Sequence, residues 1–434
     1  VPDPGSVLAL KITVPLVPDG ADPWRITPAG IECLANQTKK IVGGTELTIP
    51  EFDLVAPIVF TNDRAGLVVW WQDYVRKYGR LAARWALDMA AVEYEKVSIT
   101  YTKLSAMGFP SRDAEQLFAQ AAAFHEEARR NFAAEQYSKS YSGALRALRR
   151  LRVLMSDYWR QATITLDTPT ASPYAVSFFT LPKHWELFRE LQNCRPGENL
   201  LPFGSGEFEL PGHIPETGAR VDALPGWSAR SGTLDRVNME AVIIGSQRLE
   251  EKVKPREAPK PVKGLWAPGR PIPAPDEGYT RPTPDLGKSL LRLKVSRPEE
   301  FDKDGKPVEA SRAPLERTFL AVDSPPVQLP PGTLVRVSAW IRIPKEIEGS
   351  ADGVLFYDDA GGEPLGVRLM VQPEWRQFHL YRVVPPSGQI SVTIALTGVG
   401  TAFFDNVQIQ PMIPVDKGPP PDNHSVEAAS MRRP

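Results

Sequence analysis

The sequence predicts a multidomain α+β protein with a small N-terminal β unit, an antiparallel three-helix bundle and a C-terminal β-sandwich. Three changes of pattern predict this order. Strand-like runs fill residues 1–63, a helical period of apolar residues covers 64–165, and period-two alternation dominates from 197 to 412. The 434 residues are 42% hydrophobic and 24% charged, which is typical of a globular protein.

Composition excludes several classes of protein. The formal net charge is −1 and the pI is about 6.6, so the chain lacks the basic surface that nucleic-acid binding usually needs. It contains no run of roughly 18 to 20 apolar residues, so it is not expected to span a membrane. The chain has only two cysteines, Cys33 and Cys194. This number excludes a disulfide-rich scaffold and cysteine-based zinc clusters, but it allows one long-range disulfide.

The first two segments follow different periods. Residues 7–16, 44–49 and 54–60 are alternating or β-branched and predict strands that need a neighbour to complete their core. Beyond residue 64, helices are expected, because Pro110 is the only proline before residue 163. Large apolar residues spaced three and four apart predict the packing face of the first helix: Leu67, Trp71, Tyr74, Tyr78, Leu81, Trp85 and Val92.

The second half of the chain predicts short strands joined by proline and glycine. Residues 166–196 are interpreted as a connector packed on the bundle. Residues 250–285 contain nine prolines and predict an extended insertion, and 413–434 predict a tail. The expected strands are 290–295, 334–343, 354–357, 378–384, 390–396 and 402–409.

Three stretches of this half carry a family resemblance. The first combines Asn-Leu-Leu-Pro at 199–202, Gly-Glu-Phe-Glu at 206–209 and Pro-Gly-Trp at 225–227. The second is the strand 331–342, and the third is Ala-Phe-Phe-Asp-Asn-Val-Gln-Ile at 402–409. Together they resemble carbohydrate-binding modules of the galactose-binding type, which implies a jelly-roll sandwich.

The N-terminal β unit carries a second resemblance. Residues 51–54 and 59–63 are similar to the small sandwich that follows the catalytic barrel in many bacterial glycoside hydrolases. This resemblance implies that a catalytic or surface domain precedes Val1.

Alternation within the strand 334–343 predicts a sugar-binding face. Side chains on a strand point alternately to its two faces, so Trp340 shares the polar face with Arg336 and Arg342. An indole ring can stack on a sugar while guanidinium groups donate to its hydroxyls. The expected contacts are completed by His379, Tyr381 and Tyr357. The alternative is that the insertion or the bundle covers Trp340.

Metal and enzymatic sites are less well marked. The resemblance implies a structural calcium ion at Glu207, Glu209 and Asp405, although carboxylates at these positions can also pair with local backbone amides. The five histidines have no close metal spacing, and the chain lacks a nucleophile elbow, a phosphate-binding loop and a Rossmann glycine triplet. We therefore assign no catalytic residue.

A basic cluster at Arg146, Arg149, Arg150 and Arg152 could contact an acidic polysaccharide or a partner, or form a solvated helix surface. The hypothesis that follows is a noncatalytic, extracellular or cell-surface region of a larger secreted carbohydrate-active protein, whose sandwich binds polysaccharide or another glycan. The alternative hypothesis is a structural or assembly protein whose sandwich makes protein–protein contacts.

Overall fold

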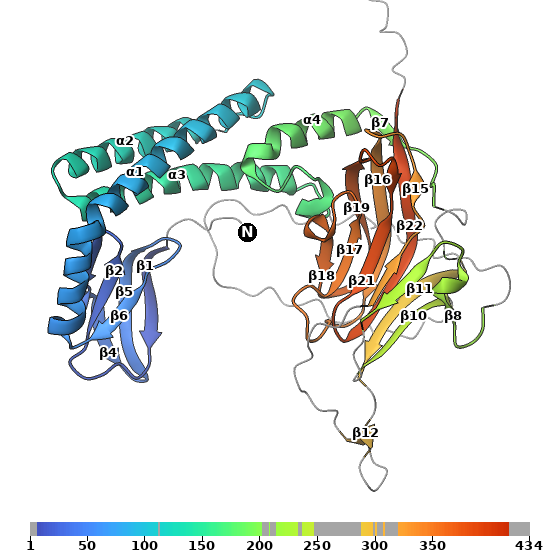
Figure 1. Ribbon diagram of the computed structural model, residues 1–434, viewed down its shortest axis with the longest axis horizontal. Helices are drawn as coiled ribbons and strands as arrows, with labels where there is room; N and C mark the ends of the chain where they lie inside the picture. Colours follow the sequence, from blue (N-terminus) through green and yellow to red (C-terminus); the bar gives the residue numbers. More distant parts are fainter. Residues whose placement is uncertain are drawn as a thin grey trace, which may run out of the picture. The chain divides into compact units, whose positions relative to one another are not determined.

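The computed structural model describes residues 7–111, 113–201, 208, 214–232, 237–246, 288–297, 300–301, 307–308 and 320–415 (Figure 1). They form two compact units. The first contains the chain up to Thr165 together with Tyr174–Glu186, and the second contains Leu166–Pro173 together with the chain from Leu187. The segment expected as a connector is therefore shared between the two units.

The N-terminal β unit consists of two three-stranded antiparallel sheets. Its core is formed by Leu34, Leu47 and Ile49, all almost completely buried. The sheet order is β1 (Val7–Val14), β5 (Gly44–Phe52), β4 (Thr38–Ile41) in one sheet and β3 (Gly30–Cys33), β2 (Asp22–Thr27), β6 (Ile58–Thr61) in the other.

Three long helices follow, as the sequence predicts. A π-helical turn over Arg64–Val68 leads into the first, and Asp63 Oδ1 accepts a hydrogen bond from Gly66 N at 2.6 Å in this turn. The helices are α1 (Val69–Ala106), α2 (Ala114–Ala133) and α3 (Tyr137–Thr163). Gly108, with φ +89°, ends α1, because this left-handed conformation favours glycine after a helix.

The packing face expected for α1 is wrong from Tyr78 onward, although Trp71 nearer its start is part-buried. Trp85 is 60% exposed and Leu81 is 46% exposed, whereas Ala86 and Ala90 are almost fully buried. The small residues of α1 pack with alanines of α2 and α3, so the backbones approach closely, and Trp85 and Leu81 are left on the opposite face. A Cβ added at Gly143 of α3 would lie 3.0 Å from the Ala128 Cβ, which shows how tight this packing is.

The remaining strands build an antiparallel sandwich, which confirms the predicted fold class. One sheet has the order β19 (Gln372–Val383), β16 (Leu334–Ile343), β22 (Gly400–Pro414), β11 (Ser289–Ser296), β10 (Asn238–Gly245), β8 (Ala219–Arg220), with β7 (Cys194–Pro196) beside β22. The other has the order β18 (Val367–Leu369), β17 (Val354–Asp358), β21 (Val392–Leu396), β14 (Leu320–Asp323), β9 (Ser228–Ser231). Figure 1 shows both sheets.

Two short ladders pair β12 (Glu300–Phe301) with β13 (Pro307–Val308) and β15 (Val327–Gln328) with β20 (Gln389–Ile390). The segments outside these sheets include α4 (Leu181–Leu191) and the 3-10 turn η3 (Pro169–Ala171). The insertion 250–285 and the tail beyond residue 415 lie outside the described residues. Within the described part, no helix is long and apolar enough to cross a membrane.

The sandwich core follows the alternation predicted for residues 334–343. Val335, Val337 and Ile341 of β16 are fully buried in the core between the sheets. The neighbouring strand β22 contains a bulge. Its register with β16 shifts between the pair Ser338–Gln408 and the pair Trp340–Asp405, and Asn406 within the shift has φ +48°. This bulge changes which side chains of β22 face the core.

Candidate functional site on the β-sandwich

The structure brings five of the six predicted sugar contacts to the outer face of the seven-stranded sheet. In the pairing of β16 with β19, Arg336 lies opposite Tyr381, and Ser338 lies opposite His379. Trp340 follows on the same face of β16, opposite Gln377. The strand alternation therefore placed these side chains on a common face.

This face does not offer the indole ring that the sequence interpretation required. Trp340 is only 8% exposed, and its neighbour Ser338 is fully buried. Asp405, which pairs with Trp340 across the sheet from β22, is also fully buried. The expectation of a solvent-exposed Trp340 is therefore corrected: in this structure the ring cannot stack on a sugar.

Segments earlier in the chain contact the same face within the sandwich unit. His379 Nδ1 lies 2.6 Å from Asp167 Oδ2, and Arg376 Nη2 donates to the Asp167 carbonyl oxygen at 3.3 Å. The Tyr381 ring meets Phe188 edge to face, with 5.9 Å between centroids. Burial raises the pKa of Tyr381. These contacts engage His379 and Tyr381 in the structure of the unit itself.

The two arginines of this face also have intramolecular partners. Arg336 donates to Gln410 Oε1 from Nη2 at 2.7 Å and from Nε at 3.2 Å. Burial lowers the pKa of Arg336. Arg342 Nε donates to the Pro373 carbonyl oxygen at 3.1 Å. Several of the N–H groups expected to bind sugar hydroxyls are thus already used.

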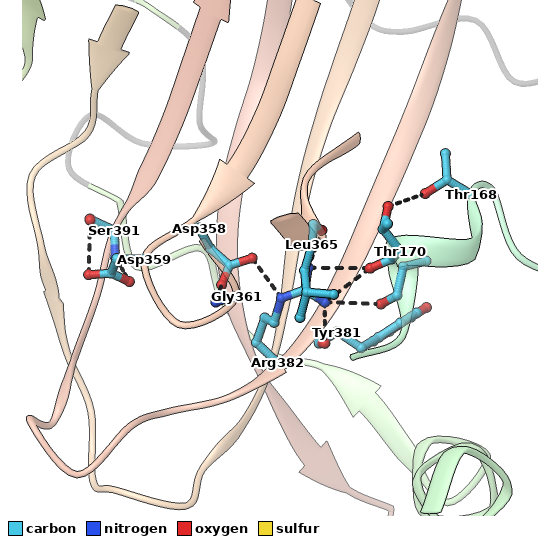
Figure 2. Close-up of polar contacts among 10 residues, drawn as sticks. Thr168, Thr170, Asp358, Asp359, Gly361, Leu365, Tyr381, Arg382 and Ser391 are labelled. Carbon is cyan, nitrogen blue, oxygen red and sulfur yellow. Dashed lines mark hydrogen bonds and ion pairs between the residues drawn. The ribbon is translucent and has the colours of Figure 1, made fainter. Parts of the chain in front are cut away.

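A buried ion pair joins the two sheets near the edge strand β19 (Figure 2). Arg382 Nε donates to Asp358 Oδ2 at 2.7 Å, and both side chains are at most 2% exposed. Asp358 Oδ1 accepts from Gly361 N at 2.7 Å. A Cβ at Gly361 would lie 2.8 Å from Arg382 Nε, so the approach of the guanidinium requires glycine there.

The guanidinium of Arg382 also holds the segment 166–173. Nη1 donates to the Thr170 carbonyl oxygen at 3.2 Å, and Nη2 donates to the Leu365 carbonyl oxygen at 2.8 Å (Figure 2). Burial lowers the pKa of Arg382 and raises that of Asp358, and the attraction between the two charges opposes both shifts. With so many internal partners, this cluster stabilises the fold and offers little to a ligand.

Tyr357, the sixth predicted contact, lies on the other sheet. Strand pairing sets it in one row of the outer face with Thr393 of β21, Asp323 of β14 and Ser228 of β9. The ring is part-exposed. The expectation that Tyr357 joins Trp340 is therefore wrong, because β17 belongs to the five-stranded sheet.

Hydrogen bonds organise the polar groups around Tyr357. Arg230 donates to Asp323 from both Nε and Nη2, the latter at 2.9 Å, and Thr393 Oγ1 donates to Asp323 Oδ1 at 2.7 Å. Burial raises the pKa of Asp323, but the bonds from Arg230 and Thr393 outweigh it and lower the pKa below its usual value. The Asp323 and Tyr357 side chains both raise the pKa of Arg230. The side chains of this cluster are therefore charged and held in place by their hydrogen bonds to one another.

An apolar row supports this cluster. Leu355, Ala395 and Ala321 lie next to one another on β17, β21 and β14, and all three are fully buried. Tyr357 packs against them. The row ends at Arg230 on β9 and at Arg368 on β18. The side chain of Arg230 is 55% exposed, so polar groups of this face reach solvent.

Sequence reasoning missed Arg230, Asp323 and Thr393. The run Leu320–Asp323 alternates correctly, with Leu320 and Val322 in the core, but four residues are too short to stand out from their surroundings. One signal could have found the site. Tyr357 and Thr393 each alternate with core residues along their strands, so alternation places both side chains on the outer face.

The structure leaves the predicted calcium site open. Glu207 and Glu209 lie outside the described residues. Asp405 Oδ1 accepts a hydrogen bond from Asn406 N at 2.8 Å, which agrees with the alternative of backbone pairing for this carboxylate. Among the described residues, no group of three or more His, Cys, Asp or Glu side chains is arranged to hold a metal ion. The calcium site remains a prediction.

Comparison with known proteins gives structural similarity alone. No family model matches the chain, and no curated protein matches it. TmCBM61 in complex with β-1,4-galactotriose is 14% identical, with a TM-score of 0.26, over 49% of this chain and 98% of that chain. The CBM22-1 xylan-binding domain of Paenibacillus barcinonensis Xyn10C is 12% identical, with a TM-score of 0.23, over 51% and 98%.

A viral protein is among the matches as well. The enzymatically active domain of bacteriophage CBA120 tailspike protein 4 is 13% identical, with a TM-score of 0.24, over 49% of this chain but only 21% of that chain. At these identities and TM-scores the similarities carry no argument about a ligand. The sandwich itself rests on the strand pairing described above.

Proposed function

We propose that the sandwich unit binds glycan on the outer face of the five-stranded sheet, with Tyr357 as the central contact. One observation carries this proposal: a part-exposed aromatic ring lies in a row of hydrogen-bonding side chains, next to the exposed Arg230 and the part-exposed Asp323. Sugars present apolar C–H faces together with hydroxyl groups, so they are recognised by an aromatic ring beside planar donors and acceptors.

Each group of the row has a separate task in this proposal. The Tyr357 ring stacks on one sugar residue, the guanidinium of Arg230 donates to hydroxyl oxygens, and Asp323 accepts from hydroxyl hydrogens. The bonds among Arg230, Asp323 and Thr393 fix these side chains before the sugar arrives, which lowers the entropy lost on binding.

The wider assignment rests on the sequence patterns. It holds that the chain is a noncatalytic, extracellular or cell-surface region of a larger secreted carbohydrate-active protein. A calcium ion at Glu207, Glu209 and Asp405 is part of this proposal as a structural ion.

Affinity electrophoresis of the full chain in native gels containing soluble xylan, galactan, mannan or mixed-linkage β-glucan tests the proposal. At least one polysaccharide should retard the unsubstituted chain. Tyr357→Ala should weaken that retardation by about tenfold, the upper end for loss of an aromatic contact. Trp375→Ala, which removes a part-exposed aromatic ring from β19, is the matched control and should leave it unchanged.

Two results would contradict the proposal: no retardation by any polysaccharide, or equal retardation of the Tyr357→Ala and unsubstituted chains. Circular dichroism of each variant shows whether it is folded.

The burial of Trp340 favours a second candidate function, in which the sandwich serves as an assembly module. This function predicts self-association without retention on polysaccharide. Analytical ultracentrifugation of the same samples separates it from glycan binding.

A further inference from the structure

A cavity of about 330 Å³ lies in the N-terminal unit, between the β unit and the first turns of α3. The α3 side comprises Tyr141, Ser142, Leu145, Arg146 and Arg149. On the β unit, Arg25 and Thr27 of β2 and Glu51 of β5 contribute to the lining. The cavity therefore combines an aromatic ring, hydroxyl groups and charged side chains.

Two arginines of the basic cluster of α3, Arg146 and Arg149, line this cavity, and the side chain of Arg146 is 50% exposed. Arg149 is 2% exposed. Arg146 Nη2 pairs with Glu51 Oε2 at 2.9 Å, and Arg149 Nη1 lies 3.5 Å from Glu51 Oε1. Arg152 Nη2 pairs with Asp53 Oδ2 at 2.7 Å. The arginines thus connect α3 to the β unit.

The ion pairs around the cavity share their carboxylates unevenly. Arg25 pairs with Glu32, and Arg152 pairs with Asp53, so these two pairs are neutral. Arg146 and Arg149, by contrast, share the single carboxylate of Glu51. The lining itself holds three arginines and three carboxylates, but Asp53 is paired with Arg152, which lies outside the lining, so Arg149 has no carboxylate of its own.

Arg149 also has an unused donor. Its Nη2 is buried and has no hydrogen-bond partner among the described residues. A buried guanidinium with an unpaired N–H and an uncompensated charge destabilises a protein, and such a group commonly marks a place where an ion, water or ligand binds. The feature therefore points to an acceptor with a negative charge.

We propose that this cavity binds a carboxylate-bearing molecule of monosaccharide size, such as a hexuronic acid. The unused Nη2 of Arg149 can donate a charge-assisted hydrogen bond to a carboxylate oxygen, while Nη1 stays with Glu51. The volume is about ten times that of one liquid water, so it is too large for a simple ion alone. The hydroxyl groups of Thr27, Tyr141 and Ser142 on the lining suit the hydroxyls of a sugar.

This site is independent of the proposed glycan site, since it lies entirely within the other compact unit. Failure of one proposal therefore leaves the other standing.

Isothermal titration of the full chain with sodium glucuronate tests the inference, with glucose, acetate and sulfate as separate titrants. Glucuronate should bind saturably, and glucose, which lacks the carboxylate, should bind at least about tenfold more weakly. Acetate and sulfate should also bind at least tenfold more weakly, since they cannot fill the cavity. Equal binding of acetate and glucuronate would overturn the sugar assignment, and no binding by glucuronate would overturn the site.

Two variants locate the binding. Ser142→Phe fills the cavity from an exposed position and leaves the ion pairs intact, so it should abolish glucuronate binding in a folded chain. Arg149→Met removes the uncompensated charge and should do the same. Arg129→Met, on the exposed surface of α2, is the control and should bind like the unsubstituted chain. Unchanged affinity in a folded Ser142→Phe chain would contradict the proposed location.

Discussion

Replacing Arg382 by methionine is expected to destabilise the sandwich unit severely. Methionine fills much of the same volume but leaves the Asp358 carboxylate buried without its counter-charge. Removing one partner of a buried ion pair costs about 3 to 5 kcal/mol of unfolding free energy. The substitution also removes hydrogen bonds to four backbone carbonyl groups, those of Thr170, Ala171, Leu365 and Tyr381.

A loss of about 5 kcal/mol is therefore expected, because unpaired buried carbonyls add to the cost of the lone carboxylate. Typical domains have only about 5 to 15 kcal/mol of stability in total, so the variant lies at the margin of folding. Urea unfolding followed by tryptophan fluorescence measures the loss. Hydrogen exchange of residues 166–173 reports whether this segment separates from the sandwich.

Two further variants separate the cost of the buried charge from that of losing an ordinary ion pair. Arg382→Met combined with Asp358→Leu leaves no buried charge and should recover about half of the loss. Arg368→Met breaks a part-exposed pair with Asp352 and should cost no more than about 1 kcal/mol. A structural role for the buried pair would be refuted if Arg382→Met cost no more than Arg368→Met, or if the double variant were no more stable than the single one.

Two other predictions concern acid and backbone strain. Burial lowers the pKa of His184 from 6.5 to about 4. As the pH falls, the histidine is therefore protonated in the unfolded chain before it is protonated in the folded chain. The free energy of unfolding should fall by about 3 kcal/mol between pH 6.5 and pH 4. His184→Gln should flatten the slope of unfolding free energy against pH over this window. Gly353→Ala should cost at least about 2 kcal/mol in urea unfolding, since φ is +65° and a Cβ would lie 2.3 Å from the Leu369 carbonyl oxygen. Gly332→Ala, also at positive φ but with open space around it, should cost about 1 kcal/mol; equal losses would refute the steric argument.

Local pattern was sufficient to predict β16 and its two faces. The strand covers residues 334–343 in both the sequence interpretation and the structure, because a long regular alternation fixes both its length and its parity. Alternation does not reveal what lies over a face. The contacts of Asp167 and Phe188 with the outer face bridge about 190 to 210 residues of sequence, and nothing local signals them.

The helix α1 shows a different limit. Spacing by three and four identified a continuous apolar face, but the middle of the helix buries Ala83, Ala86, Leu87 and Ala90 instead. Small residues permit closer helix contact than Trp85 or Leu81 would allow, and that gain in packing decided which face is inside. For Tyr357 the difficulty was topology, because the sequence does not state to which sheet a strand belongs.

The chain crosses between the two compact units more than once, since Leu166–Pro173 belongs to the sandwich unit and Tyr174–Glu186 to the other. A single proteolytic cut therefore cannot yield both units complete. A recombinant fragment that starts at residue 197 would lack Thr170 and Asp167, leaving Arg382 and His379 without those partners. For crystallisation or binding work on the isolated sandwich, the fragment should begin at or before Leu166.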